Sequence, residues 1–77
     1  MPPPTTFKRT DLSKNLFRLY RMTPCTTLFG ELCLRIEWGR QGRRLRARSE
    51  IFQSTLELER RLLQLVKVRK QHGYVAA

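Results

Sequence analysis

The residues best suited to chemistry in this sequence are a tryptophan, two glycines and a group of arginines in one short stretch. Trp38-Gly39-Arg40-Gln41-Gly42 is followed directly by four more arginines, namely Arg43, Arg44, Arg46 and Arg48. A planar guanidinium donates paired hydrogen bonds to phosphates and base edges, and an indole ring stacks on bases. This combination predicts recognition of a polyanion, with nucleic acid as the first choice.

The charge of the whole chain shows the same bias. Its 77 residues include 16 Lys and Arg against 6 Asp and Glu, a formal net charge of +10, and such a surface attracts polyanions. Twelve of the cations are arginine, which favours nucleic acid over an anionic membrane or an acidic protein. Codon bias in a GC-rich genome also enriches arginine, and Arg40 could be a solvated turn residue, so both of these interpretations stay open.

Side chains for catalysis or metal binding are scarce. The chain has one histidine, His72, and lacks both the Gly-x-Ser-x-Gly and the phosphate-binding Gly-x-x-x-x-Gly-Lys motifs. Glu57 and Glu59 are two apart on a predicted helix and point in different directions. Cys25, Cys33 and His72 supply at most three metal ligands without paired spacing. The sequence therefore predicts no enzyme, no metal site, no cofactor and no small-molecule substrate.

The cysteine content bears on the expected location. Two cysteines are too few for a disulfide-stapled secreted scaffold. No stretch has the form of a signal peptide, and none approaches the roughly 20 apolar residues of a membrane span. We therefore expect a cytoplasmic protein with both thiols reduced and no membrane association.

The elements that position the candidate residues can be predicted from the hydrophobic pattern. Residues 1–14 are expected to form a flexible basic arm, because Pro2 to Pro4 cannot join a regular element and the stretch after them shows no period. A strand is predicted from Leu16 to Met22, and it should stop at Thr23-Pro24.

A second strand is predicted from Leu28 to Trp38, where apolar residues alternate with charged or small ones. The two glycines after it predict a tight turn, and a basic strand follows from Arg43 to Ser49, so that Arg40 lies at the tip of a hairpin. Alternation places three cations of this basic strand on one face, which we interpret as a phosphate track: Arg44, Arg46 and Arg48.

The C-terminal part of the chain has the pattern of a helix. Ser54-Thr55-Leu56-Glu57 has the spacing of a capping box, and leucines then recur along one stripe. A helix is expected from Thr55 to Gln71, capped by Gly73. The stripe and the apolar sheet face can only be hidden against each other. The predicted fold is therefore α+β, an antiparallel sheet of three to four strands with one amphipathic C-terminal helix packed on one face, in a single domain of residues 15–77.

These residues resemble the WGR domain family, which is named for the tripeptide found at Trp38. The resemblance covers about residues 15–75. Besides the tripeptide, it includes an aromatic first strand at Phe17 to Tyr20, a turn at Leu28 to Gly30, Phe52 before the capped helix, and Lys70-x-x-Gly73-Tyr74. The proteins most similar in this respect are short stand-alone bacterial members of the family.

The resemblance implies roles for individual residues. In poly(ADP-ribose) polymerases that sense DNA damage, a WGR domain grips the end of a broken strand, with its Trp on the terminal sugar and its Arg reaching the nucleotide and neighbouring domains. By resemblance these roles belong to Trp38 and Arg40, with Gly39 permitting close approach. Two residues depart from the family pattern: Gln41 replaces an aliphatic residue, and acidic Glu37 precedes the Trp.

We therefore predict a non-enzymatic module that binds nucleic acid, DNA in preference to RNA, with strand ends or nicks as the candidate target. The predicted contact residues are Trp38, Gly39, Arg40, Arg43, Arg44, Arg46, Arg48, Lys67 and Lys70. Two alternatives stay open, namely docking on an acidic protein partner, and binding of RNA or single strands with Trp38 and Tyr20 stacking on bases. The period alone would make Trp38 a core residue, whereas the resemblance favours its exposure.

Overall fold

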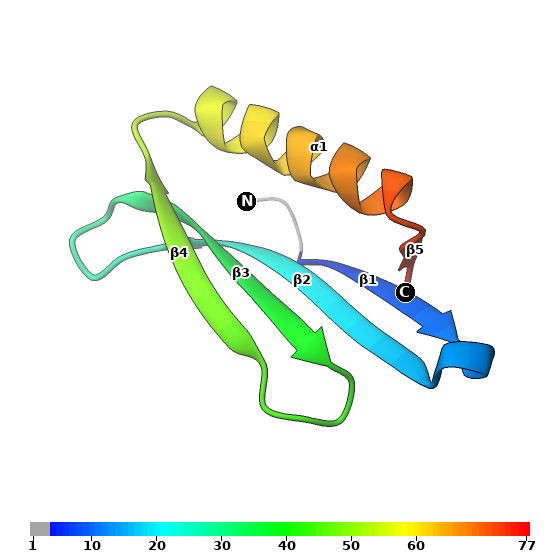
Figure 1. The fold of residues 1–77 in the computed structure, drawn as a ribbon. Helices are drawn as coiled ribbons and strands as arrows, with labels where there is room; N and C mark the ends of the chain where they lie inside the picture. Colours follow the sequence, from blue (N-terminus) through cyan, green and yellow to red (C-terminus); the bar gives the residue numbers. More distant parts are fainter. Residues whose placement is uncertain (1–3) are drawn as a thin grey trace.

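The computed structural model describes residues 4–77, so residues 1–3 of the predicted arm lie outside the described part. The elements in chain order are β1 (Thr5–Asp11), a 3-10 helix (Leu12–Lys14), β2 (Leu16–Thr26), β3 (Leu32–Arg40), β4 (Arg46–Phe52), α1 (Thr55–Gln71) and β5 (Val75–Ala76). The strands form one antiparallel sheet in the order β4-β3-β2-β1-β5. Figure 1 shows α1 lying across one face of this sheet, which confirms the predicted α+β class.

Within residues 4–77 the sheet has five strands, more than the three to four predicted, and the additional ones lie at the two ends of this range. β1 pairs with β2 from Thr5 opposite Met22 to Asp11 opposite Leu16, and β5 pairs with the other edge of β1. The prediction of a flexible arm was therefore wrong for residues 5–11. Only Phe7 of β1 is buried, at 2% exposed, and a single buried residue produces no hydrophobic period in the sequence.

β2 also continues past its predicted stop at Thr23-Pro24. Pro24 lies opposite Leu34 of β3, whereas the pairing with β1 ends at Met22. Proline lacks an N–H donor and is tolerated where a strand needs no donor on one side. The boundaries of α1 agree with the prediction, and the capping group is present, because the Ser54 hydroxyl accepts a hydrogen bond of 3.3 Å from the Glu57 N–H.

The longer β2 brings the two cysteines together. Cys25 and Cys33 lie directly opposite each other in β2 and β3, with their Cα atoms 5.2 Å apart, and form a disulfide. The prediction of two reduced thiols is therefore wrong in this structure. The pairing could not be predicted because the first strand was expected to stop at Thr23-Pro24, before Cys25.

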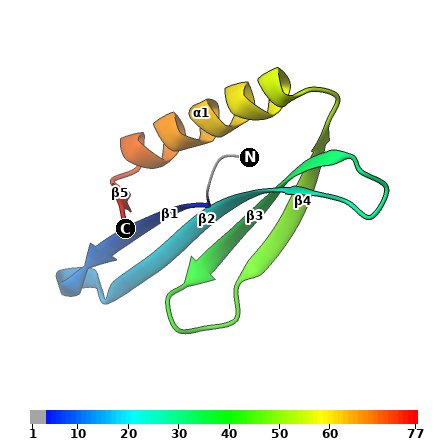
Figure 2. The same cartoon turned by 180° about the vertical axis from the view of Figure 1, so that it is seen from behind.

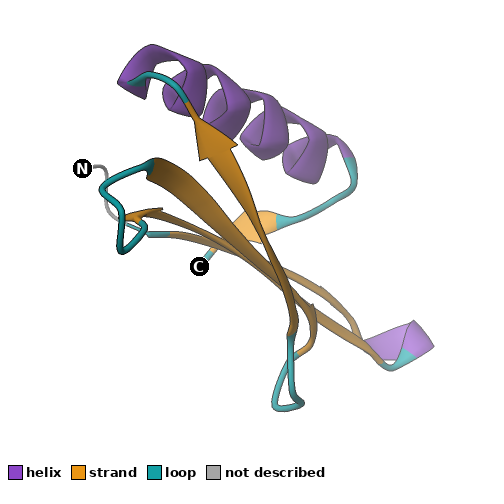
Figure 3. Ribbon diagram, turned by 90° about the vertical axis from the view of Figure 1, so that its left-hand side faces the viewer, coloured by secondary structure: helices purple, strands orange, loops and turns teal. Residues whose placement is uncertain are grey.

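The hydrophobic core lies between α1 and the sheet face that it covers. Its buried members are Phe7, Tyr20, Met22, Leu34, Ile36 and Leu65. Directly opposing residues of neighbouring strands share a face, so the pairings of Tyr20 with Phe7 and with Trp38 place Trp38 on the same side. The β3–β4 hairpin extends beyond α1 (Figures 1 and 2), and no α-helix formed by residues 4–77 lies on the other face of the sheet (Figure 3).

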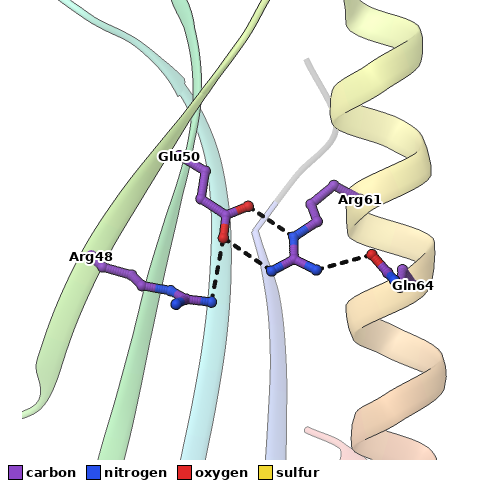
Figure 4. A network of polar contacts seen from close by, with 4 residues as sticks. All are labelled: Arg48, Glu50, Arg61 and Gln64. Atoms are coloured by element: carbon purple, nitrogen blue, oxygen red, sulfur yellow. Dashed lines mark hydrogen bonds and ion pairs between the residues drawn. The ribbon is translucent and has the colours of Figure 1, made fainter.

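A polar network joins α1 to β4 (Figure 4). Arg61 donates from Nε to Glu50 Oε1 at 2.8 Å and from Nη2 to Oε2 at 3.0 Å, and its Nη1 donates to Gln64 Oε1 at 2.9 Å. Arg48 Nη2 lies 3.3 Å from Glu50 Oε2. The hydrogen bonds from Arg61 lower the pKa of Glu50 and, in return, raise the pKa of Arg61.

This network predicts a pH-dependent contribution to stability. Because the folded-state pKa of Glu50 is below its ordinary value of 4.5, its contribution is fully present above pH 4.5 and is lost as the pH falls through the folded-state pKa. We expect Glu50→Gln to lower the free energy of unfolding by about 1 kcal/mol at neutral pH, and this difference from wild type should shrink in acid. Urea unfolding followed by Trp38 fluorescence measures it, and a difference that stays constant down to acid pH would contradict the assignment.

Candidate nucleic-acid interface

A recess lies between the last turns of α1 and strands β2 to β4. Its volume is about 270 Å³, and it is lined by Tyr20, Ile36, Trp38, Arg48 and Arg69. Tyr20 and Ile36 are buried core residues, while the two arginines enter from β4 and from α1. Aromatic rings beside two guanidinium groups can hold a phosphate together with its sugar or base.

Trp38 is half-buried in this recess. Part of the ring packs against the core, and part lines the recess. Its neighbours across the strands are Tyr20 on β2 and Arg46 on β4. The indole is therefore neither sealed in the core nor held free in solvent, and a ligand in the recess would meet its remaining exposed surface.

Arg69 lines the recess from the last turn of α1 and was not among the predicted contact residues. Its guanidinium carbon lies 4.4 Å from the centroid of the Tyr20 ring and 5.2 Å from that of Tyr74, an arrangement stabilised by cation–π attraction. Its Nε atom is buried without a hydrogen-bond partner among the described residues. The signal in the sequence was an arginine in the otherwise apolar stripe of the helix, eleven positions after Leu58.

The arginines that follow the hairpin divide into two groups. β4 begins at Arg46, so Arg43 and Arg44 lie before the strand and not on it as predicted. Arg46 lies opposite Trp38, and Arg48 lies opposite Ile36, so these two share the helix-facing side of the sheet with the recess. The predicted shared face of Arg46 and Arg48 is therefore present, and it is the face that carries Trp38.

Arg40 lies apart from Trp38. Its guanidinium carbon is 5.7 Å from the centroid of the Phe17 ring, and Arg40 is not among the residues that line the recess. Phe17 is three residues from Tyr20 along β2, so strand alternation places these two rings on opposite faces. Trp38 and Arg40, to which the resemblance gives the two contact roles, therefore do not line the same recess.

The packing of the hairpin explains why a glycine stands at position 39. Its φ is +152°, and a Cβ atom added there would lie 3.2 Å from Leu45 Cδ2 and 3.5 Å from Leu45 Cα. The glycine thus lets the returning chain pass close to β3. The tip is fixed further by a 2.8 Å hydrogen bond that the Gln41 N–H donates to the Phe17 carbonyl.

The remaining predicted contact residues lie elsewhere. Lys67 and Lys70 are exposed and line a separate groove on α1 with Leu63, Val66 and Gln71, so they do not contribute to the recess. Glu37, which would repel a phosphate if unpaired, lies 4.0 Å from Arg21 and 3.9 Å from Arg35. Strand alternation places it on the face opposite Trp38, so it does not line the recess.

Features of two further kinds of site are missing within residues 4–77. This part of the chain contains no group of three His, Cys, Asp or Glu side chains that could hold a metal ion. None of its helices combines the length and the apolar composition that a membrane crossing requires.

Comparison with known proteins identifies a family. The WGR domain family matches residues 4–77, a range that includes β1. The chain is also 33% identical over 67 residues to the uncharacterized protein y4dW of Sinorhizobium fredii (strain NBRC 101917 / NGR234). This match covers 87% of the chain but 33% of the relative, so the chain spans about a third of that protein's length. No solved structure matches the chain.

The contact between Gly39 and Leu45 predicts unequal effects at the two hairpin glycines. We expect Gly39→Ala to destabilise the domain by about 1–3 kcal/mol, because the methyl group meets Leu45 in a backbone conformation that favours glycine. Gly42→Ala is the matched control, since Gly42 also has a positive φ, +81°, but open space around it. Urea unfolding compares the two variants, and equal losses would show that backbone conformation alone accounts for the effect.

Proposed function

The chain belongs to the WGR domain family, and we propose that it is a non-enzymatic module that binds nucleic acid, DNA in preference to RNA, in the recess beside Trp38. The family is known for nucleic-acid binding in proteins related to poly(ADP-ribose) polymerases. One observation carries the proposal: a half-buried indole shares a single recess with guanidinium groups that come from two separate elements, Arg48 of β4 and Arg69 of α1.

The chemistry of the recess suits a sugar-phosphate unit. A phosphate between Arg48 and Arg69 would accept charge-assisted hydrogen bonds, which are stronger than those between neutral groups. The free surface of Trp38 would then pack on the adjoining sugar or on an unstacked base. Arg46 lies opposite Trp38 and would contact the next phosphate. Such contacts position a strand without reading its bases, so we expect binding to depend on shape and not on sequence.

The size of the recess favours strand ends or nicks as the target. A volume of about 270 Å³, bounded by sheet and helix, accepts one nucleotide unit and excludes a whole duplex. A nucleotide inside a duplex is stacked on both sides, and extruding it costs a few kcal/mol. A terminal nucleotide already has one free side, so its entry into the recess costs less.

An acidic protein partner is the second candidate. The observation that favours it is the ion pair between Arg48 and the Glu50 carboxylate at 3.3 Å, since it shows that a guanidinium lining the recess already binds a carboxylate. Aspartate or glutamate side chains of a partner would use the same donors, but they would leave the aromatic surface of Trp38 without a function.

The proposal predicts distinct effects for three variants on DNA affinity. Wild type, Trp38→Ala, Arg48→Ala, Arg40→Ala and the control Arg35→Ala are titrated against closed circular DNA and against the same DNA made linear with 5′-phosphates. We expect Trp38→Ala to weaken binding to linear DNA about tenfold, which is the loss of one stacking contact of roughly 1–3 kcal/mol. Arg48→Ala should weaken it by a similar factor, through one lost charge-assisted contact. Arg40→Ala should have a smaller effect, because its guanidinium lies on Phe17.

Salt dependence and competition separate the candidates. If Arg46, Arg48 and Arg69 each neutralise one phosphate, the logarithm of the affinity should fall with the logarithm of salt concentration at a slope of about −3. A salt-insensitive affinity, or equal affinities for all variants, would contradict nucleic-acid binding in the recess. Equal binding to closed and linear DNA would contradict only the preference for ends, and stronger competition by polyglutamate than by DNA would select the acidic partner.

A further inference from the structure

Beside the recess, arginines of three neighbouring strands lie in direct register. Arg9 of β1 lies opposite Arg18 of β2, and Arg18 lies opposite Arg40 of β3. Like charges directly opposite each other destabilise a strand pair. Arg40 extends towards Phe17, which leaves Arg9 and Arg18 as two directly opposed cations on neighbouring strands.

This pair lies on the helix-facing side, one row away from the recess. Phe7 lies opposite Tyr20, and Tyr20 lies opposite Trp38. Arg9 and Arg18 are each two residues from this row along β1 and β2, and so lie on the same face. Two residues along a strand span about 7 Å, and neighbouring strands are about 4.8 Å apart, so the pair is within reach of a ligand that also occupies the recess.

The two guanidinium groups are available for a ligand. Within residues 4–77 the arginines that form ion pairs are Arg21, Arg35, Arg48 and Arg61. The acidic residue on the same face of β1, Asp11, accepts hydrogen bonds from the Ser13 N–H at 3.1 Å and from the Ser13 hydroxyl at 2.6 Å.

The chain after α1 passes close to Arg9. A Cβ atom added to Gly73 would lie 3.6 Å from Arg9 Nε, an ordinary van der Waals distance. Arg18 is exposed, and Arg9 is half-buried. One guanidinium of the pair is thus held near the end of α1, and the other faces solvent.

We propose that Arg9 and Arg18 form a second phosphate subsite, so that a strand with one nucleotide in the recess continues across β2 to β1, perpendicular to the strands. The ligand of this subsite is the phosphodiester backbone of the adjoining nucleotides. The proposal rests on nucleic-acid binding in the recess. It differs in direction from a track along β4, because Arg9 and Arg18 lie on β1 and β2.

The test compares a short oligonucleotide, of which one nucleotide extends beyond the recess, with a longer one that can cross the whole subsite. Fluorescent thymidine oligomers of two and of ten nucleotides, both with 5′-phosphates, are titrated with wild type, the double variant Arg9→Ala with Arg18→Ala, and Arg35→Ala as a control from the opposite face. We expect the double variant to bind the ten-nucleotide strand about tenfold more weakly, through the loss of two solvent-screened charge-assisted contacts. Its salt slope should be less steep by about 1.4, at roughly 0.7 per phosphate of a single strand.

Three further results are expected. Affinity for the two-nucleotide strand should fall by less than that for the ten-nucleotide strand, because only one of its nucleotides extends beyond the recess. The melting temperature of the double variant should be equal to or above that of wild type, since a repulsive pair is removed. Replacing both arginines by lysine should restore the salt slope.

The outcomes distinguish this proposal from the one on which it rests. If Trp38→Ala no longer binds either oligonucleotide while the double variant binds both with wild-type affinity, the second subsite is overturned. Binding in the recess is then still supported. An equal loss for both lengths, or the same loss in Arg35→Ala, also overturns the subsite, because it indicates a general field effect. If wild type binds neither oligonucleotide nor duplex DNA, both proposals fail.

Discussion

The length of α1 is the constraint on which the rest of this structure depends. Seventeen residues make a helix of about 26 Å, whereas the longest dimension of the molecule is 44 Å. One helix therefore hides only part of the apolar sheet face. Tyr20, Ile36 and Trp38 lie where the helix stops covering the sheet. The recess between the helix and β4 exists because no other described element covers these residues.

The arrangement of charge around that recess opposes the stability of the isolated domain. Arginines from β1, β2, β4 and α1 lie on the same side of a thin sheet, and the carboxylate that neutralises part of this charge is Glu50, which Arg61 and Arg48 share. Repulsion of this kind lowers the stability of the unbound protein, and a polyanion that binds across the arginines would offset it.

The three residues of the family's tripeptide have separate physical roles in this chain. Trp38 closes the core and lines the recess. Gly39 lets Leu45 approach the backbone of β3, which shapes the hairpin and not the ligand. Arg40 packs on Phe17, and the recess that Trp38 lines is also lined by Arg69 of α1. The cation nearest to the tryptophan in the sequence is therefore not one that shares its recess.

Local patterns in the sequence determined the elements with strong signals: the alternation into Trp38, the glycine turn, the capped helix from Thr55 to Gln71, and the net positive charge. They could not determine β1, because a strand with one buried residue shows no hydrophobic period. They could not determine the disulfide, because Pro24 predicted a strand stop although β2 continues past it to Thr26. Which cations share the recess was decided only by the tertiary structure. Arg69 is 31 positions from Trp38, and only the packing of α1 on the sheet brings both to one recess. Arg40, two positions from Trp38 and the last residue of β3, lies over Phe17 instead.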